Sequence, residues 1–301
     1  MSLLLFLATA EAQAPSLAWK WDGTPVRYVS EMTMKNGSTQ WLMARRNTEA
    51  RAGEVSLSLA LVCVGDGDGR VEVVCEIEGA KMDGVGVANE GDSLQVIFRE
   101  WETELKTADV VLSMDGVGRV RSLDLEGLSR GTAREGVTNE LMRMYVTRAL
   151  APLDLQLPKN GEVDGSWKQK GSPLALRMIA TTRAPGLEGV AITSAATQGG
   201  MRLVHEVTGE QDGYPLIQSV GEAVAMISPT VAGSVSQTVG MTLSGQCLFD
   251  AERGQIKACS QVINAEPTAQ NMSGMYNGNK YLYQTIQFTR VDDFSGYDWV
   301  Q

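Results

Sequence analysis

The sequence predicts a mainly β protein built from antiparallel curved sheets, arranged as a sandwich or an open half-barrel. Short runs rich in β-branched residues alternate with Gly-rich turns along most of the 301 residues, which is the spacing of antiparallel sandwiches and barrels. A hairpin that carries two cysteines also occurs once in each half of the chain. This repetition indicates two similar halves, each combining a curved sheet with one packing helix.

The two cysteine pairs are each expected to form a disulfide within one hairpin. In LVCVGDGDGRVEVVCEI, Cys63 and Cys75 flank an Asp-Gly-rich tip, and in GQCLFDAERGQIKACSQ, Cys247 and Cys259 stand at the same separation. Asp-Gly steps supply the backbone conformations of tight hairpin turns, so the paired cysteines should lie opposite each other. Such local disulfides are typical of an oxidising compartment. Four cysteines nevertheless allow three connectivities.

Metal binding is the alternative interpretation of these two hairpins. Redox and zinc motifs place cysteines roughly two to four residues apart, and neither spacing occurs here. The run GDGDG has the alternating carboxylates of a calcium loop, Asp66 and Asp68, but no third oxygen ligand and no bidentate glutamate follow in register. The sequence therefore favours hairpin turns over a metal site, and it suggests no cofactor.

The same alternation predicts further strands along the chain. Residues 108–127 form a third hairpin without cysteines, which turns at Asp115-Gly116, and the step Asn36-Gly37 predicts another. The other predicted strands are residues 26–34, 40–46, 55–64, 93–100, 174–181, 189–195, 201–207, 241–249, 255–262 and 281–290.

Two segments have the periodicity of helices rather than strands. Residues 138–150 place apolar side chains on one helical stripe and end shortly before Pro152. Residues 216–227 do the same between Pro215 and Pro229. We therefore expect one helix in each half of the chain.

The chain is expected to consist of a signal peptide and two β-rich halves. Residues 1–14 contain a short apolar run and small residues that suit a cleavage site, although no positive charge precedes the run. An apolar N-terminal strand is the alternative. The N-terminal half covers residues 15–152 and the C-terminal half covers residues 153–301. The boundary lies at a connector rich in Pro, Asn and Gly.

That connector, LPKNGEVDGSW, resembles a pattern of uncharacterised secreted or periplasmic bacterial β-proteins, in which an LP pair, a valine and G-[ST]-W open a new sheet. The hairpins VVLSMDGVGRV and CLFDAERGQIKAC are similar to strand pairs of the same kind of protein. Twisted sheets backed by a helix are more distantly similar to the open barrels of periplasmic lipoprotein carriers. The resemblance implies an all-β fold and an envelope or extracellular location, and it implies no catalytic residue.

Charge and hydropathy bound the partners of the protein. The net charge is −10 and the pI is about 4.8, which argues against nucleic acid or an anionic membrane surface as partner. No segment approaches the roughly 18 consecutive apolar residues of a transmembrane span. Together with the cysteines, these observations predict a periplasmic or extracellular location.

Few residues are candidates for catalysis. His205 is the single histidine, and it is expected to be a hydrogen-bonded sheet residue because no G-x-S-x-G elbow accompanies it. Glu100, Glu102 and Glu104 alternate around Trp101 in REWETEL. On a strand these carboxylates would share one face, and a glycoside hydrolase needs two acids and an aromatic platform. A solvated face with Trp101 turned inward is the favoured interpretation.

Aromatic side chains are the candidates for binding. Tyr276, Tyr281 and Tyr283 lie in or beside the Asn/Gly-rich run NMSGMYNGNKYLY, and with Trp101 they are the candidate ligand- or partner-binding residues. Ordinary core or rim positions are the alternative for all four.

These observations predict an exported, non-enzymatic β-rich protein that binds a hydrophobic small molecule or acts as an envelope interaction module. Curved sheets covered by a helix often enclose an apolar cavity, and the 14 methionines suit an adaptable lining. A structural or assembly component that presents sheet edges to protein partners is the alternative. A carboxylate-dependent hydrolase is the remote one.

Overall fold

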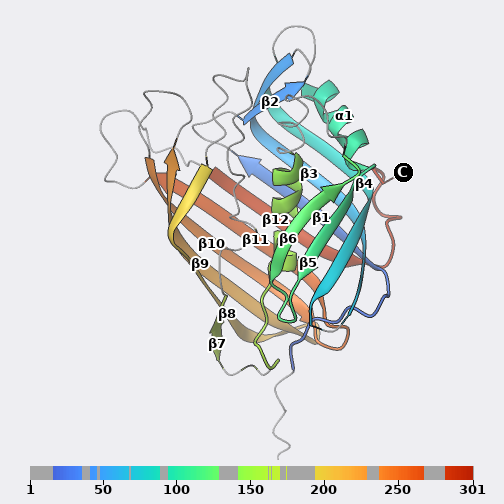
Figure 1. The fold of residues 1–301 in the computed structure, drawn as a ribbon, viewed down its shortest axis with the longest axis vertical. Coiled ribbons are helices and arrows are strands. Elements are labelled where there is room, and N and C mark those ends of the chain that lie inside the picture. Colours follow the sequence, from blue (N-terminus) through green and yellow to red (C-terminus); the bar gives the residue numbers. More distant parts are fainter. Residues whose placement is uncertain are drawn as a thin grey trace, which may run out of the picture.

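A computed structural model of the chain shows one antiparallel sheet of twelve strands that curls into an open half-barrel (Figure 1). The structure describes residues 16–35, 41–45, 48–67, 69–88, 94–128, 142–161, 163, 165–169, 174, 194–228, 237–267 and 282–300. The predicted fold class, a mainly β protein with an open curved sheet, is confirmed. Residues 1–14, the predicted signal peptide, lie outside the described residues.

The strands follow one another in space as β6-β5-β4-β3-β1-β12-β11-β10-β9-β8-β7, with β2 paired to β3. Their bounds are β1 (Val26–Lys35), β2 (Trp41–Arg45), β3 (Thr48–Asp66), β4 (Val71–Ala88), β5 (Asp109–Met114), β6 (Val120–Glu126), β7 (Ser166–Lys168), β8 (Ser194–Gln211), β9 (Tyr214–Ser228), β10 (Gln237–Asp250), β11 (Gln255–Pro267) and β12 (Leu282–Val291).

The sheet is continuous, because the first described strand of the chain, β1, pairs with the last strand, β12. The division into two halves at residue 153 therefore crosses a continuous sheet, and it stays a prediction. The expected Asn36-Gly37 hairpin is wrong in its pairing. β1 pairs with residues 54–63 of β3 and β2 pairs with residues 48–52 of the same strand, so β1 and β2 follow one another along β3.

Two α-helices and a 3₁₀ helix accompany the sheet in the described part of the chain. Helix α1 (Leu94–Leu105) packs beside β4, where Glu102 Oε1 accepts a 2.6 Å hydrogen bond from the Met82 amide. Residues 142–149 are helical, within the predicted range 138–150, and the 3₁₀ helix η1 (Ala151–Asp154) follows. Among the described residues, no helix combines the length and the hydrophobicity that crossing a bilayer would take.

The helix 142–149 lies inside the curl of the sheet (Figure 1). The Ser30 hydroxyl of β1 donates a 2.7 Å hydrogen bond to the Ala149 carbonyl, which fixes the helix against the centre of the sheet. Most residues of the helix are buried, and only Arg143 and Thr147 are partly exposed. Its buried apolar residues join one core with the inner faces of the strands: Met142, Met144, Tyr145, Val146, Ala149 and Leu150.

The N-terminal residues 16–25 close one end of the curl. Trp19 stacks parallel to Trp21 and meets the edge of Phe249 in β10, while its indole nitrogen donates a 2.9 Å hydrogen bond to the Leu155 carbonyl. The Leu17 amide donates to the Gly161 carbonyl. Segments far apart in the sequence therefore meet at this end.

Two sequence predictions of secondary structure are wrong. Residues 216–227, predicted as a helix, form β9, because the two-residue loop Asp212-Gly213 with positive φ turns β8 directly back into it. Residues 93–100, predicted as a strand, fall largely in α1, whose buried residues recur at helical spacing: Ile97, Phe98, Trp101 and Leu105.

Both predicted disulfides are present. Cys63–Cys75 joins β3 to β4 and Cys247–Cys259 joins β10 to β11, and in each hairpin the two cysteines are direct cross-strand partners. The four residues are buried. Each bond therefore fixes the register of a hairpin from inside the core.

Removing either disulfide is expected to lower the free energy of unfolding by about 2–3 kcal/mol, because each closes only a short loop. We expect this loss for Cys63→Ala/Cys75→Ala and again for Cys247→Ala/Cys259→Ala, measured by urea unfolding, with both proteins still folded. A reducing agent should shift the wild type and leave the four-alanine variant unchanged. Non-reducing peptide mapping that linked Cys63 to Cys247 would contradict this pairing.

Candidate functional site

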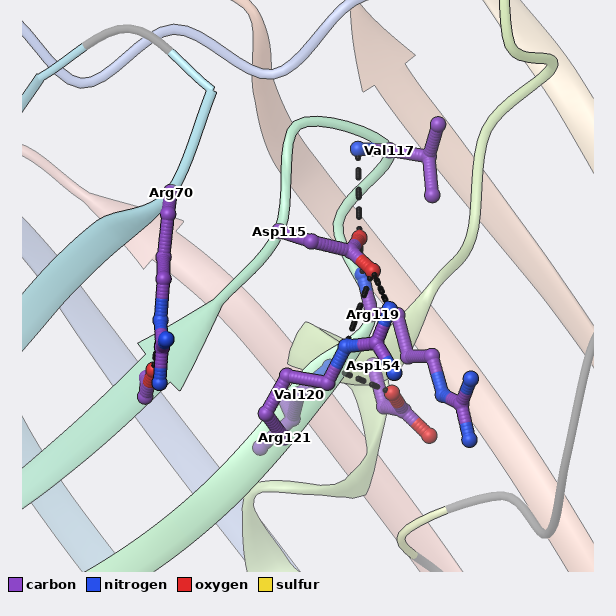
Figure 2. Close-up of polar contacts among 8 residues, drawn as sticks. Arg70, Asp115, Val117, Arg119, Val120, Arg121 and Asp154 are labelled. Carbon is purple, nitrogen blue, oxygen red and sulfur yellow. Dashed lines mark hydrogen bonds and ion pairs between the residues drawn. The ribbon is translucent and has the colours of Figure 1, made fainter.

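The tight turn between β5 and β6 is organised by one carboxylate (Figure 2). Asp115 Oδ1 accepts hydrogen bonds from the backbone amides of Val117 and Arg119, at 3.3 and 3.0 Å. Asp115 Oδ2 accepts from Nε and Nη2 of Arg121, at 3.0 and 2.7 Å. The charge of Arg121 is therefore compensated within the turn, whereas the side chain of Arg119 extends away from Asp115 (Figure 2).

A glycine allows this turn to approach the rest of the molecule. Gly118 has a φ of +87°, and a Cβ built on it would lie 2.0 Å from the Trp19 indole nitrogen and 2.7 Å from the Leu155 carbonyl oxygen. Only a residue without a side chain fits there. The Leu157 amide then donates a 2.8 Å hydrogen bond to the Val117 carbonyl, which ties the turn to the segment after η1.

Asp154, at the end of η1, connects the two outer regions of the curled sheet. Its Oδ1 accepts a 2.8 Å hydrogen bond from the Val120 amide of β6, the strand at one end of the sheet order. Its Oδ2 accepts from Gln169 Nε2 at 3.1 Å and from the Leu174 amide at 2.7 Å, just beyond β7 at the other end. The carboxylate is buried. It thus forms a polar seam where strand pairing does not close the half-barrel.

A cleft of about 520 Å³ lies along this seam, a volume within the usual range for small-molecule sites. It is lined by the β5–β6 turn, by the residues after η1 and by β7: Asp115, Gly116, Val117, Arg119, Arg121, Gln156, Leu157, Pro158, Lys159, Trp167 and Lys168. Four of these side chains are cationic and one is a carboxylate. Among the described residues, no ion pair engages Arg119, Lys159 or Lys168.

The floor of the cleft combines an aromatic ring with this excess of positive charge. Trp167 is partly buried against the core, and its indole nitrogen donates a 2.7 Å hydrogen bond to the Gln156 carbonyl. Its ring is thereby fixed beside Leu157 and Pro158. A second cleft of about 530 Å³ has a smaller excess, because three carboxylates, Asp22, Glu252 and Asp292, stand against the four cations in its lining.

Behind Trp167, a chain of buried hydrogen bonds runs from the sheet to Asp154. The Ser219 hydroxyl lies 2.7 Å from His205 Nδ1, and His205 Nε2 lies 3.0 Å from Gln169 Oε1. Gln169 Nε2 donates to the Asp154 carboxylate, so its Oε1 faces His205 and the imidazole donates from Nε2. Burial lowers the pKa of His205 to about 4, and the ring is neutral at pH 7.

This chain has the residue types of a nucleophilic relay, but its serine is not accessible. Ser219 and His205 are 2% and 1% exposed, and the Trp167 ring packs 5.5 Å from the imidazole, centroid to centroid. General-base activation of a serine requires a substrate within reach of its oxygen. We interpret the network as structural support for β7 and Trp167. The expectation that His205 is a hydrogen-bonded sheet residue is confirmed.

The other predicted site residues lie elsewhere. Trp101 is buried and packs against Tyr145 at 6.1 Å between ring centroids, and Tyr283 is half-buried in β12. Tyr276 and Tyr281 lie outside the described residues. A binding role for these four aromatic residues stays a prediction.

The carboxylates around Trp101 do not share a strand face. Glu100, Glu102 and Glu104 lie on α1, where Glu100 and Glu104 are one turn apart and Glu102 is directed to β4. The arrangement expected of a hydrolase strand is therefore wrong. Within the residues that the structure describes, no cluster of three or more His, Cys, Asp or Glu side chains is suited to a metal ion.

Sequence reasoning missed the lining of the cleft, although the connector LPKNGEVDGSW supplies Leu157, Pro158, Lys159 and Trp167. From the sequence, this connector indicates a domain boundary and a resemblance to secreted β-proteins, and it indicates no binding site. The juxtaposition with Arg119 depends on the curl of the whole sheet, which no local pattern reveals. The sequence features that could have pointed to the cleft are the DGVGR turn and the GSW strand.

Comparisons with known proteins place the chain near no family. No protein-family model matches it, and no curated protein matches it in sequence. A solved structure of lipovitellin, titled for its lipid–protein interactions, has a TM-score of 0.45 and 9% identity. The likeness covers 90% of this chain and 25% of that one, so the chain spans about a quarter of the lipovitellin chain. The resemblance to secreted bacterial β-proteins is not confirmed by these comparisons.

Proposed function

We propose that the protein is an exported, non-enzymatic binding protein whose seam cleft binds an amphiphile with a multiply charged anionic head group. The observation that carries this proposal is the cleft itself, an indole floor with three cations that make no ion pair with a described residue, in a chain of net charge −10. The sequence predicts a hydrophobic ligand, and this proposal specifies the ligand as an amphiphile with an anionic head group.

Phosphate is the head group that this charge distribution favours. Arg119, Lys159 and Lys168 approach from three different segments, and a phosphate presents three oxygens to donors that converge. Trp167, Leu157 and Pro158 offer apolar surface to the remainder of the molecule. A free phosphate would use the cations alone, whereas an alkyl phosphate would use both parts of the cleft.

Export is supported by the two disulfides, which are characteristic of proteins from oxidising compartments. It is also supported by the apolar run at the start of the sequence. We place the protein in the periplasm or outside the cell. The net negative charge would repel anions from most of its surface, so that anions would bind preferentially at the seam cleft.

Dodecyl phosphate is the probe that tests this function. By isothermal titration calorimetry, we expect saturable binding with one ligand per chain, and the double variant Arg119→Glu/Lys168→Glu should bind roughly tenfold or more weakly. Raising the salt concentration should weaken binding to the wild type and have less effect on the variant. Trp167→Ala should weaken dodecyl phosphate more than inorganic phosphate.

The matched control is Lys81→Glu/Lys257→Glu, which reverses two cations outside the cleft on β4 and β11. This control makes the same change in net charge. The proposal fails if the control and the cleft variant weaken binding equally, or if dodecyl phosphate does not bind the wild type. Equal affinity for inorganic phosphate and dodecyl phosphate would contradict the amphiphile and leave only an anion site.

A further inference from the structure

A buried arginine inside the curled sheet has no carboxylate partner among the residues that the structure describes. Arg148 belongs to the helix at residues 142–149 and is 1% exposed. Its Nη1 donates a 2.8 Å hydrogen bond to Gln284 Oε1 of β12 and lies 3.4 Å from the Met34 sulfur of β1. Burial lowers the pKa of Arg148 to about 10, so the guanidinium remains charged at neutral pH.

Three hydrogen-bond donors around this guanidinium lack an acceptor among the described residues. They are Arg148 Nε, the Tyr145 hydroxyl and Gln284 Nε2, all in side chains that are at most 1% exposed. Tyr145 and Arg148 are three residues apart and therefore share one face of the helix. Gln284 is joined to Arg148 by its own hydrogen bond. The group thus presents donors and one positive charge, and what it lacks is an anionic acceptor.

A buried cation with neutral partners only is costly to the folded state, since desolvation is not offset by an opposite charge. Apart from Gln284 itself, the neighbouring positions on the same face of β1 and β12 carry apolar side chains. Met34 is the cross-strand partner of Gln284, and Met32 is the partner of Ile286 next along the strands. All three apolar side chains are buried. Flexible methionines can rearrange around an aliphatic chain.

We propose that Arg148, Tyr145 and Gln284 form an internal site for the carboxylate of a long-chain aliphatic acid, with the chain lying among the apolar residues of β1 and β12. One guanidinium matches a monoanionic head group. This distinguishes the internal site from the seam cleft, whose three cations favour phosphate. The internal site does not depend on the function proposed for the cleft.

Palmitate and its methyl ester test the proposal, because the ester keeps the chain and lacks the charge. By displacement of a fluorescent fatty-acid analogue from the delipidated full chain, we expect the wild type to prefer the acid by roughly 10- to 100-fold, the range of charge-assisted hydrogen bonds. In Arg148→Met this preference should fall to about one. The ratio reports on the head group even if a variant is less stable.

Tyr145→Phe keeps the test decisive if Arg148→Met does not fold. The hydroxyl it removes has no partner among the described residues, so the variant should fold normally and reduce the preference roughly threefold to tenfold. The matched control Arg143→Met lies on the same helix, where Arg143 pairs with Asp124 near the surface, and it should keep the wild-type preference.

The proposal is overturned if the wild type binds acid and ester equally, if it binds neither, or if Arg148→Met keeps the preference. The cleft variant Arg119→Glu/Lys168→Glu separates the two sites. It should lose dodecyl phosphate and keep the palmitate preference, and a loss of the preference in that variant would place the acid in the cleft instead.

Discussion

Asp154→Ala is expected to lower the free energy of unfolding by about 4 kcal/mol, the largest effect of any single substitution considered for this protein. Three donors lose the carboxylate at once, namely the Val120 amide, the Leu174 amide and Gln169 Nε2, and each buried donor left without an acceptor costs about 1–3 kcal/mol. The loss is a large part of the stability of an ordinary domain. Urea unfolding followed by far-UV circular dichroism measures it.

Because of where Asp154 lies, its substitution should also affect residues beyond its direct hydrogen-bond partners. The carboxylate joins β6 to the residues beyond β7, and through Gln169 it holds His205. We therefore expect Asp154→Ala to weaken dodecyl phosphate binding at the seam cleft as well. Asp154→Asn, which keeps one acceptor oxygen, should lose about half as much stability.

Asp124→Ala is the matched control for this substitution. Asp124 forms an ion pair with Arg143, but its side chain is 58% exposed, and exposed pairs contribute about 0–1 kcal/mol. If the two alanine variants unfold at the same urea concentration, Asp154 does not hold the two ends of the sheet together.

The sequence predicts the hairpins well because their determinants are local. Alternating β-branched residues and Asp-Gly tips specify β3–β4 and β5–β6, and Asp250 with Gly254 marks the turn of β10–β11. Both cysteine pairs follow from the register of their hairpins. The failures at residues 216–227 and 93–100 share one cause. Short apolar runs fit both periods, and only the flanking turn Asp212-Gly213 or the full set of buried positions decides between them.

The candidate sites could not be predicted in the same way. The seam cleft requires β6 and β7 to come close, although they are at opposite ends of the sheet order, and this depends on the summed twist of twelve strands. The internal group requires Arg148 of the helix to meet Gln284, which is 136 residues away. Arg148 lies among apolar residues of the helix sequence MRMYVTRA, and only the fold shows that it is buried while Arg143 reaches the surface.

The stability of the protein is expected to fall by about 3 kcal/mol as the pH decreases from about 6.5 to about 4, through His205 alone. The folded pKa of about 4 lies below the ordinary value of 6.5 because the ring is buried. In this window the unfolded chain takes up a proton that the folded protein does not. The contribution of the neutral His205 to the free energy of unfolding is therefore complete above pH 6.5 and is lost as the pH falls through the folded pKa.

His205 is the single histidine of the chain, which makes the test direct, since no other side chain normally titrates between pH 5 and 7. The difference in unfolding free energy between the wild type and His205→Gln should be largest at pH 7 and shrink steadily toward pH 4. Carboxylates such as Asp250, whose pKa the Arg253 amide and Arg290 lower against the opposing effect of burial, titrate similarly in both proteins and cancel in the difference. Parallel stability profiles would mean that the imidazole is accessible to protons in the folded protein, and that the buried chain from Ser219 to Asp154 does not hold it neutral.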